Sequence, residues 1–280
     1  MNNLKTVALL GFMSALVAAV AYYFSGGFVI PMLFVIGFNV IAYFFSDKMA
    51  IAATRAQPVE EHELPQVYSM VRNLTARTGM PMPRIYLINS PQPNAFATGR
   101  NPENAAVAVT TGILQMLSND ELEGVMAHEL AHVANRDILI SSIAAMLAAA
   151  LSLFARMSLF MGGGRDRNNP LGALISIAGI ILAPFAAMLI KAAISRTREF
   201  QADASGAEIT GRPMYLASAL EKISAGTARV PMNVNPATSQ LFIDNPLKAI
   251  RAGGLTNLFS THPPAEERIR RLHEMAQGLR

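Results

Sequence analysis

The 280-residue chain contains no cysteine. This absence excludes disulfides, thiolate catalysis and every cysteine-based zinc or iron–sulfur site, so a bound metal would need histidine and carboxylate ligands. Charged residues are scarce as well, at 15% of the sequence, where soluble domains have roughly a quarter. The mean hydropathy is correspondingly positive, at +0.32. This composition predicts an integral membrane protein.

The net charge of +4 and the isoelectric point near 9.6 raise the question of nucleic-acid binding. Phosphate binding requires basic side chains that gather on one face of a domain. Here the Lys and Arg residues are scattered or flank apolar runs. We therefore expect no nucleic-acid partner.

A long run without charge opens the chain, from Thr6 to Ser46. As one helix this run would be roughly 60 Å long, about twice the hydrocarbon thickness of a bilayer. Residues 1–46 are therefore predicted to form an uncleaved transmembrane hairpin that turns near Ser25, Gly26 and Gly27.

Two further uncharged runs, Ile138–Ala155 and Asn168–Ile190, predict a second transmembrane helix pair over residues 138–190. Both are near the minimum length for a span, so a pair of buried core helices is the alternative. The polar segments 47–137 and 191–280 would then form one catalytic domain that is divided by this pair.

Basic residues gather at one end of the predicted spans, among them Lys5, Lys48, Arg55 and Lys191. Short cytoplasmic loops carry an excess of Lys and Arg. Both termini and the polar domain are therefore expected on the cytoplasmic side.

Within the polar segments, residues 83–89 and 105–112 are rich in Val, Ile and Tyr and predict strands of a small sheet. Ser118 followed by Glu121 matches a capping box and predicts the start of a helix. A last helix is expected over residues 261–279, opened by Pro263 and Pro264.

The stretch MAHELAHVANRD places His128 and His132 four residues apart, around Glu129. A helix brings residues i and i+4 to one face, so both imidazoles can bind one ion. Together with the glutamate they form H-E-x-x-H, in which two histidines bind Zn²⁺ and the carboxylate acts on the attacking water.

A catalytic zinc has three protein ligands. Ile138 occupies the place of the third histidine of the metzincin pattern, which is thereby excluded. Glu199 is the first glutamate downstream, and Asp203 follows it at i+4. This spacing offers one carboxylate for the metal and one to support a ligand. Alternatively, both acids neutralise Arg196 and Arg198 on a surface helix.

Four motifs in this order, PNAFATG, HELAH, REFQAD and STHPPAEERI, resemble the HtpX group of membrane-bound zinc metallopeptidases over essentially the whole chain. The resemblance implies that His128, His132 and Glu199 bind one zinc per chain and that Glu129 is the general base. It further implies a stress-response role in the bacterial inner membrane, with cleavage of damaged membrane proteins at the cytoplasmic face and possible self-cleavage.

The resemblance also extends to residues with supporting roles. Asn94, Ala95 and Phe96 match a segment whose edge strand can pair with an extended substrate; alternatively, the segment is a proline-bounded loop with Phe96 as a core residue. His262 and Arg268 match residues near the active site, and His262 could stabilise the oxyanion. Thr261 and His262 could instead cap the last helix.

The sequence thus predicts a mainly α integral membrane protein with about four transmembrane helices and a cytoplasmic, helical zinc-peptidase domain that contains a small β-sheet. Its expected partners are the lipid bilayer and protein or peptide substrates, and no motif specifies an oligomeric state. Two rival interpretations are an intramembrane protease, which the polar start of the motif helix disfavours, and a zinc-binding scaffold that holds misfolded chains without cleaving them.

Overall fold

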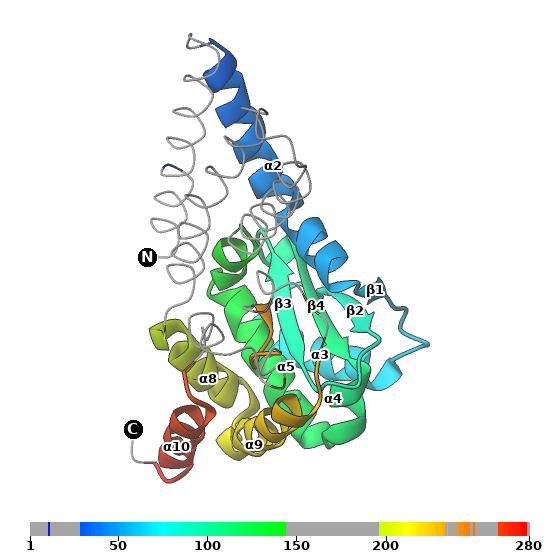
Figure 1. Cartoon of the computed structure of the whole chain (residues 1–280). Coiled ribbons are helices and arrows are strands. Elements are labelled where there is room, and N and C mark those ends of the chain that lie inside the picture. Colours follow the sequence, from blue (N-terminus) through cyan, green and yellow to red (C-terminus); the bar gives the residue numbers. More distant parts are fainter. Residues whose placement is uncertain are drawn as a thin grey trace, which may run out of the picture.

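The computed structural model describes residues 11, 29–143, 196–232, 234, 239, 241–246, 249 and 263–278. In Figure 1 a small sheet and the helices packed on it form one body, and helix α2 extends away from that body. The candidate site residues lie within the body.

The sheet has four strands in the order β1-β2-β4-β3. The strands are β1 (Gln57–Pro58), β2 (Arg84–Ile88), β3 (Ala95–Gly99) and β4 (Ala105–Thr110). β4 is central and completely buried; it pairs in parallel with β2 and antiparallel with β3. The predicted strands over 83–89 and 105–112 are confirmed as β2 and β4.

Strand β3 lies at one edge of the sheet, inside the proline-rich segment that follows β2. In its register Ala95 faces Val109 and Ala97 faces Val107. The carbonyl of Asn94 accepts from the amide of Thr110 at 3.0 Å. Since hydrogen-bonded and non-bonded pairs alternate in an antiparallel ladder, the main-chain groups of Ala95 and Ala97 point away from β4.

Helices make up most of the described chain. They are α2 (Val29–Thr54), α3 (Pro65–Thr78), α4 (Thr111–Met116), α5 (Asn119–Ala134), α8 (Arg196–Thr210), α9 (Pro213–Arg229) and α10 (Ala265–Ala276), with a 3₁₀ turn at Pro102–Asn104. The predicted C-terminal helix is confirmed as α10, and its N-cap is Pro264. Thr261 and His262 lie outside the described residues.

Helix α5 is the centre of the domain, since it contacts α3, α8, α9 and β3. Its start is fixed by the predicted capping box: Ser118 accepts from the amide of Glu121, and the Glu121 carboxylate accepts from the amide of Ser118. Apolar side chains that recur at helical spacing along α5 are buried in the core, namely Leu122, Val125, Met126, Leu130 and Val133. The H-E-x-x-H motif lies on an adjoining side of the helix, where His128 and Glu129 are buried as well.

Two glycines allow neighbouring helices to approach α5 closely. A Cβ on Gly206 of α8 would lie 2.9 Å from the backbone nitrogen of His128, and a Cβ on Gly124 would lie 2.6 Å from that of Leu216 in α9. Real Cβ atoms do not come this close to backbone, so any side chain at Gly206 would push α8 away from the first histidine.

Helix α2 exposes large apolar side chains, including Leu33, Ile36, Ile41 and Phe44. It continues past Ser46, the end of the predicted hairpin, to Thr54. Among the described residues, no helix meets both the length and the hydropathy that crossing a membrane demands. The first predicted span and nearly all of the second predicted pair lie outside the described residues, so the four-span topology stays a prediction.

Candidate active site

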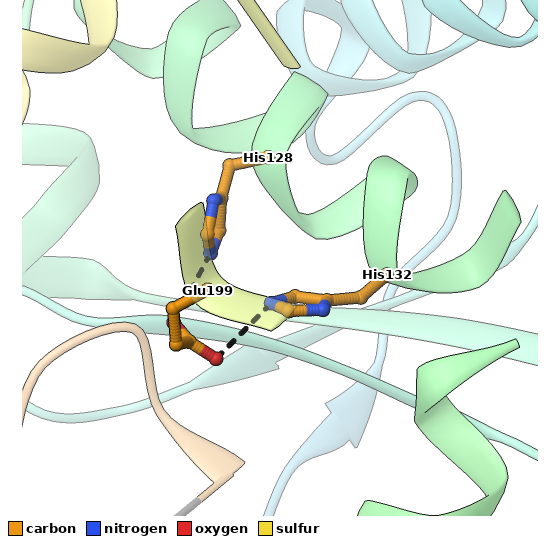
Figure 2. A group of neighbouring side chains, drawn as sticks. All are labelled: His128, His132 and Glu199. Atoms are coloured by element: carbon orange, nitrogen blue, oxygen red, sulfur yellow. Dashed lines mark ion pairs between the residues drawn. The ribbon is translucent and has the colours of Figure 1, made fainter. Parts of the chain in front are cut away.

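His128 and His132 lie one turn apart on α5, with their rings 4.7 Å apart at an angle of 86°. Figure 2 shows both imidazoles directed toward Glu199, which comes from α8. His128 is 1% exposed and Glu199 is 5% exposed. The three side chains therefore meet inside the domain, and Glu199 is not an acid of a surface helix.

The three side chains offer donor atoms that all lie within 4.8 Å of one another. A Glu199 oxygen lies 3.8 Å from Nε2 of His128, and another lies 3.5 Å from Nε2 of His132. Ligands held roughly 2.0–2.2 Å from a tetrahedral zinc lie roughly 3.3–3.6 Å from each other. Two imidazoles and one carboxylate are also the ligand set of many catalytic zinc sites, so the cluster fits this metal in chemistry, and its two histidine–glutamate separations are close to this spacing.

Glu129 lies between the two histidines in sequence and is 3% exposed. Burial raises the pKa of its carboxyl, and the nearby Glu199 carboxylate adds to this rise. The backbone amide of Ala97 in β3 acts in the opposite direction and lowers this pKa. Glu129 is thus positioned between the metal ligands and the edge strand, with a raised proton affinity that suits a general base.

Asp137 supports His132 from just beyond the end of α5. Its Oδ2 lies 3.1 Å from Nδ1 of His132, on the side of the ring away from Glu199. Arg136 has a left-handed φ of 58°, which turns the chain at this point. Burial alone would lower the pKa of His132, but Glu199 and Asp137 outweigh this effect and raise the pKa to about 9.

Asp203 supports His128 in the same way, since its Oδ1 lies 3.0 Å from Nδ1 of that ring. Arg268 of α10 binds both oxygens of Asp203, with Nε at 2.9 Å and Nη2 at 2.7 Å. Burial would raise the pKa of Asp203, but the charges of Arg268 and His128 lower it to about 2. Asp203 is therefore a fixed anion that orients His128.

The segment matched to substrate binding starts the edge strand. Asn94, Ala95 and Phe96 are each 0% exposed. The ring of Phe96 packs edge-on against Phe242, with centroids 5.2 Å apart. Phe96 is thus a core residue, as the alternative interpretation held, although the segment is a strand and not a loop.

The structure brings most of the predicted site residues together. His128, Glu129, His132, Glu199, Asp203 and Arg268 form one cluster, in which all but the partly buried His132 are buried, whereas His262 lies outside the described residues. Sequence reasoning missed Asp137 and the segment 241–246, which contacts Arg268 and β3. The only sequence signal for Asp137 was an acid five residues after the second histidine.

A buried H-E-x-x-H helix, a glutamate from a second helix and a carboxylate behind each histidine define the site of a metallopeptidase. The family model for Peptidase family M48 matches residues 61–276, which include all these residues.

Two relatives are similar in sequence to this chain over nearly its full length. A "Protease HtpX homolog" from Burkholderia multivorans (strain ATCC 17616 / 249) is 52% identical, with 99% of this chain and 98% of that protein covered. One from Ralstonia pickettii (strain 12J) is also 52% identical, with 99% and 97% covered. The chain therefore belongs to Peptidase family M48, a family of zinc metallopeptidases, and within it to the HtpX type, as the sequence resemblance predicted.

Among solved structures, the crystal structure of S. mikatae Ste24p is similar to this chain, with a TM-score of 0.49 and 18% identity. The match covers 96% of this chain and 64% of that protein, so this chain spans less than two thirds of its length.

Proposed function

We propose that the protein is a zinc-dependent endopeptidase that cleaves unfolded stretches of damaged or misassembled membrane proteins at the cytoplasmic face of a bacterial inner membrane. The observation that carries this proposal is the buried cluster of His128, His132 and Glu199 beside the Glu129 carboxylate. Self-cleavage would follow from the same chemistry when the chain's own unfolded segments reach the site.

In this proposal one zinc is held by His128, His132 and Glu199, and it supplies a Lewis acid. Glu129 accepts the proton of the attacking water and delivers it to the nitrogen of the leaving amine. Asp137 and Asp203 hold the outer nitrogens of the two imidazoles, at 3.1 and 3.0 Å. These contacts fix the nitrogens that face the metal.

The membrane setting is supported by the exposed apolar side chains of α2 and by the long uncharged runs of the sequence. The predicted orientation places both termini and the catalytic domain in the cytoplasm. The edge of β3 provides main-chain groups beside Glu129, which supports recognition of extended chains of varied sequence.

The test compares wild type with Glu129→Gln, using unfolded casein and added Zn²⁺. We expect both proteins to bind zinc, since Glu129 is not in the ligand cluster, and we expect the variant to lose about 10²- to 10⁴-fold in turnover. Zinc content and product fragments are measured on the same samples. Near-wild-type turnover in Glu129→Gln would remove Glu129 from its role, and zinc-loaded wild type that binds casein without cleaving it would favour the scaffold interpretation.

A further inference from the structure

Residues 241–246 lie along the outward edge of β3. The backbone amide of Ile243 donates to the carbonyl of Ala95 at 2.8 Å, which is a main-chain group that points away from β4. Phe242 and Ile243 are 0% and 2% exposed. The segment bends at residues 242–244 and forms no strand, but it takes up a main-chain group that an added peptide strand would use.

The side chain of Asn94 forms hydrogen bonds with the backbone of Asp244, the residue after Ile243. Its Nδ2 donates to the carbonyl of Asp244 at 2.9 Å, and its Oδ1 accepts from the amide of Asp244 at 3.3 Å. An amide side chain that pairs with both main-chain groups of a residue makes no demand on that residue's side chain. Asn94 can therefore hold any extended polypeptide in this position.

Arg268 connects the same segment to the metal cluster. Its Nη1 donates to the carbonyl of Ile243 at 3.2 Å and lies 3.8 Å from the Glu199 carboxylate. The guanidinium also binds Asp203, which supports His128. The Ile243 carbonyl is thus separated from a proposed zinc ligand by a single side chain.

Strand β3 gives the same proximity independently. The Ala95 carbonyl accepts from the amide of Ile243, and the amide of Ala97, two residues further along the same edge, is near enough to Glu129 to lower the pKa of that carboxyl. Two residues of a strand span about 7 Å. The segment therefore lies on the strand edge within about one residue pair of the proposed general base.

We infer that Phe242–Asp244 is an internal peptide that covers the outward edge of β3 at Ala95 and must leave this edge before an extended substrate can bind there. This inference rests on the proposed function and adds its regulation. The occupant is held by main-chain contacts that a substrate would reproduce, and by side-chain anchors that a substrate lacks: the Phe242–Phe96 ring contact and a hydrogen bond from the Thr227 hydroxyl to the Asp244 carboxylate.

With an internal occupant, the apparent affinity for substrate is the intrinsic affinity multiplied by the fraction of molecules in which the occupant has left the β3 edge. Removing an anchor raises that fraction while Asn94, Ala95 and Arg268 stay intact. Substrate binding should therefore become tighter when an anchor is lost, although the protein itself becomes less stable.

The experiment uses the full-length, zinc-loaded chain and fluorescently labelled unfolded casein. Binding is measured by anisotropy in the Glu129→Gln background, and cleavage is measured with Glu129 present. Phe242→Ala should bind casein at least about five-fold more tightly and raise kcat/KM by a similar factor. Thr227→Val, which keeps the shape of the side chain and removes its hydrogen bond, should act in the same direction and serves if Phe242→Ala does not fold.

Leu74→Ala is the matched control, because Leu74 is equally buried in α3 and makes no ring contact or hydrogen bond with the segment. It should lower stability without tightening binding. If the folded, zinc-loaded anchor variants bind casein no better than wild type, the segment is a fixed part of the domain and the inference is overturned. If the anchor variants bind casein more tightly but neither they nor the wild type cleave it, the proposed function is overturned and the inference about the segment stands.

Discussion

Glu199 and Asp203 lie one turn apart on α8 and have different surroundings. Glu199 faces both imidazoles, at 3.5 and 3.8 Å. Asp203 reaches only the far nitrogen of His128 and is held by two hydrogen bonds from Arg268. The geometry therefore favours Glu199 as the metal ligand and Asp203 as the residue that orients a ligand.

We predict that Glu199→Ala loses zinc more readily than Asp203→Ala when both are titrated with the same chelator, and that both lose activity. Loss of a residue that only orients a ligand typically costs about 10- to 100-fold in metal affinity, whereas loss of a ligand costs more. Zinc retention at each chelator concentration is the readout. If Asp203→Ala empties the site and Glu199→Ala keeps its metal, the two roles are reversed.

The sequence predicted the residues whose role depends on local spacing. His128 and His132 are a helical i, i+4 pair, and Glu199 followed from the lack of other candidates downstream. Asp137 escaped prediction, because its contact with His132 depends on the left-handed turn at Arg136, and a charged residue rarely signals that conformation. The role of Ile243 depends on main-chain contacts. Almost any residue type can make such contacts, so the sequence does not indicate them.

At the scale of helices, the site depends on how closely α8 approaches α5. The strand and helix boundaries that were predicted correctly carry strong local signals, such as the β-branched residues of β4 and the capping box of α5. Strand β3 was expected only through the family resemblance, since its small residues are buried on both faces and give no alternation. The two-residue strand β1 gives no pattern at all.

Gly206→Ala should weaken zinc binding and lower stability together. The added methyl would lie 2.9 Å from the backbone of His128, so α8 must shift and carry Glu199 away from the histidines. Overpacking of this kind costs about 1 to 3 kcal/mol. Ser205→Ala, on the same helix, is the matched control and should change neither the melting temperature nor zinc affinity. Normal zinc affinity in Gly206→Ala would show that the helix contact does not position the site.

The Glu121 carboxyl at the start of α5 should make the stability of the fold depend on pH. Burial would raise the pKa of Glu121, but bonds from Lys222, Ser218 and Ser118 lower it from 4.5 to about 2. A carboxyl whose pKa is lower in the folded state stabilises the fold above its unfolded pKa, and this stabilisation is lost as the pH falls toward about 2.

Glu121→Gln should therefore lower the free energy of unfolding by about 1 to 3 kcal/mol near pH 7, the lower figures allowing for the half-exposed Lys222. The difference from wild type should shrink between pH 4.5 and about 2. Denaturant unfolding of the metal-free protein in chelator measures this without a contribution from zinc loss. A difference that stays constant across this range would contradict the assigned pKa.

For the whole molecule, the exposed apolar side chains of α2 and the position of the His128, His132 and Glu199 cluster inside the folded domain predict a protein anchored at the membrane with its site outside the hydrocarbon. A reporter fused after Arg280 should behave as cytoplasmic, and one inserted at residues 161–167 should behave as extracytoplasmic. The positive-inside pattern is the physical reason. A cytoplasmic signal from the inserted reporter would mean that residues 138–190 do not span the membrane, and it would leave the zinc site unaffected.

We predict that one zinc, held by His128, His132 and Glu199, is required for peptide hydrolysis by this chain. The most direct measurement removes the metal from the wild-type protein with a chelator, restores Zn²⁺ in steps, and follows zinc per chain and casein cleavage on the same sample. We predict that cleavage is absent without zinc, rises in proportion to bound zinc and levels off at one zinc per chain. Cleavage that persists in the zinc-free protein, or that stays absent at one bound zinc per chain, would contradict the account.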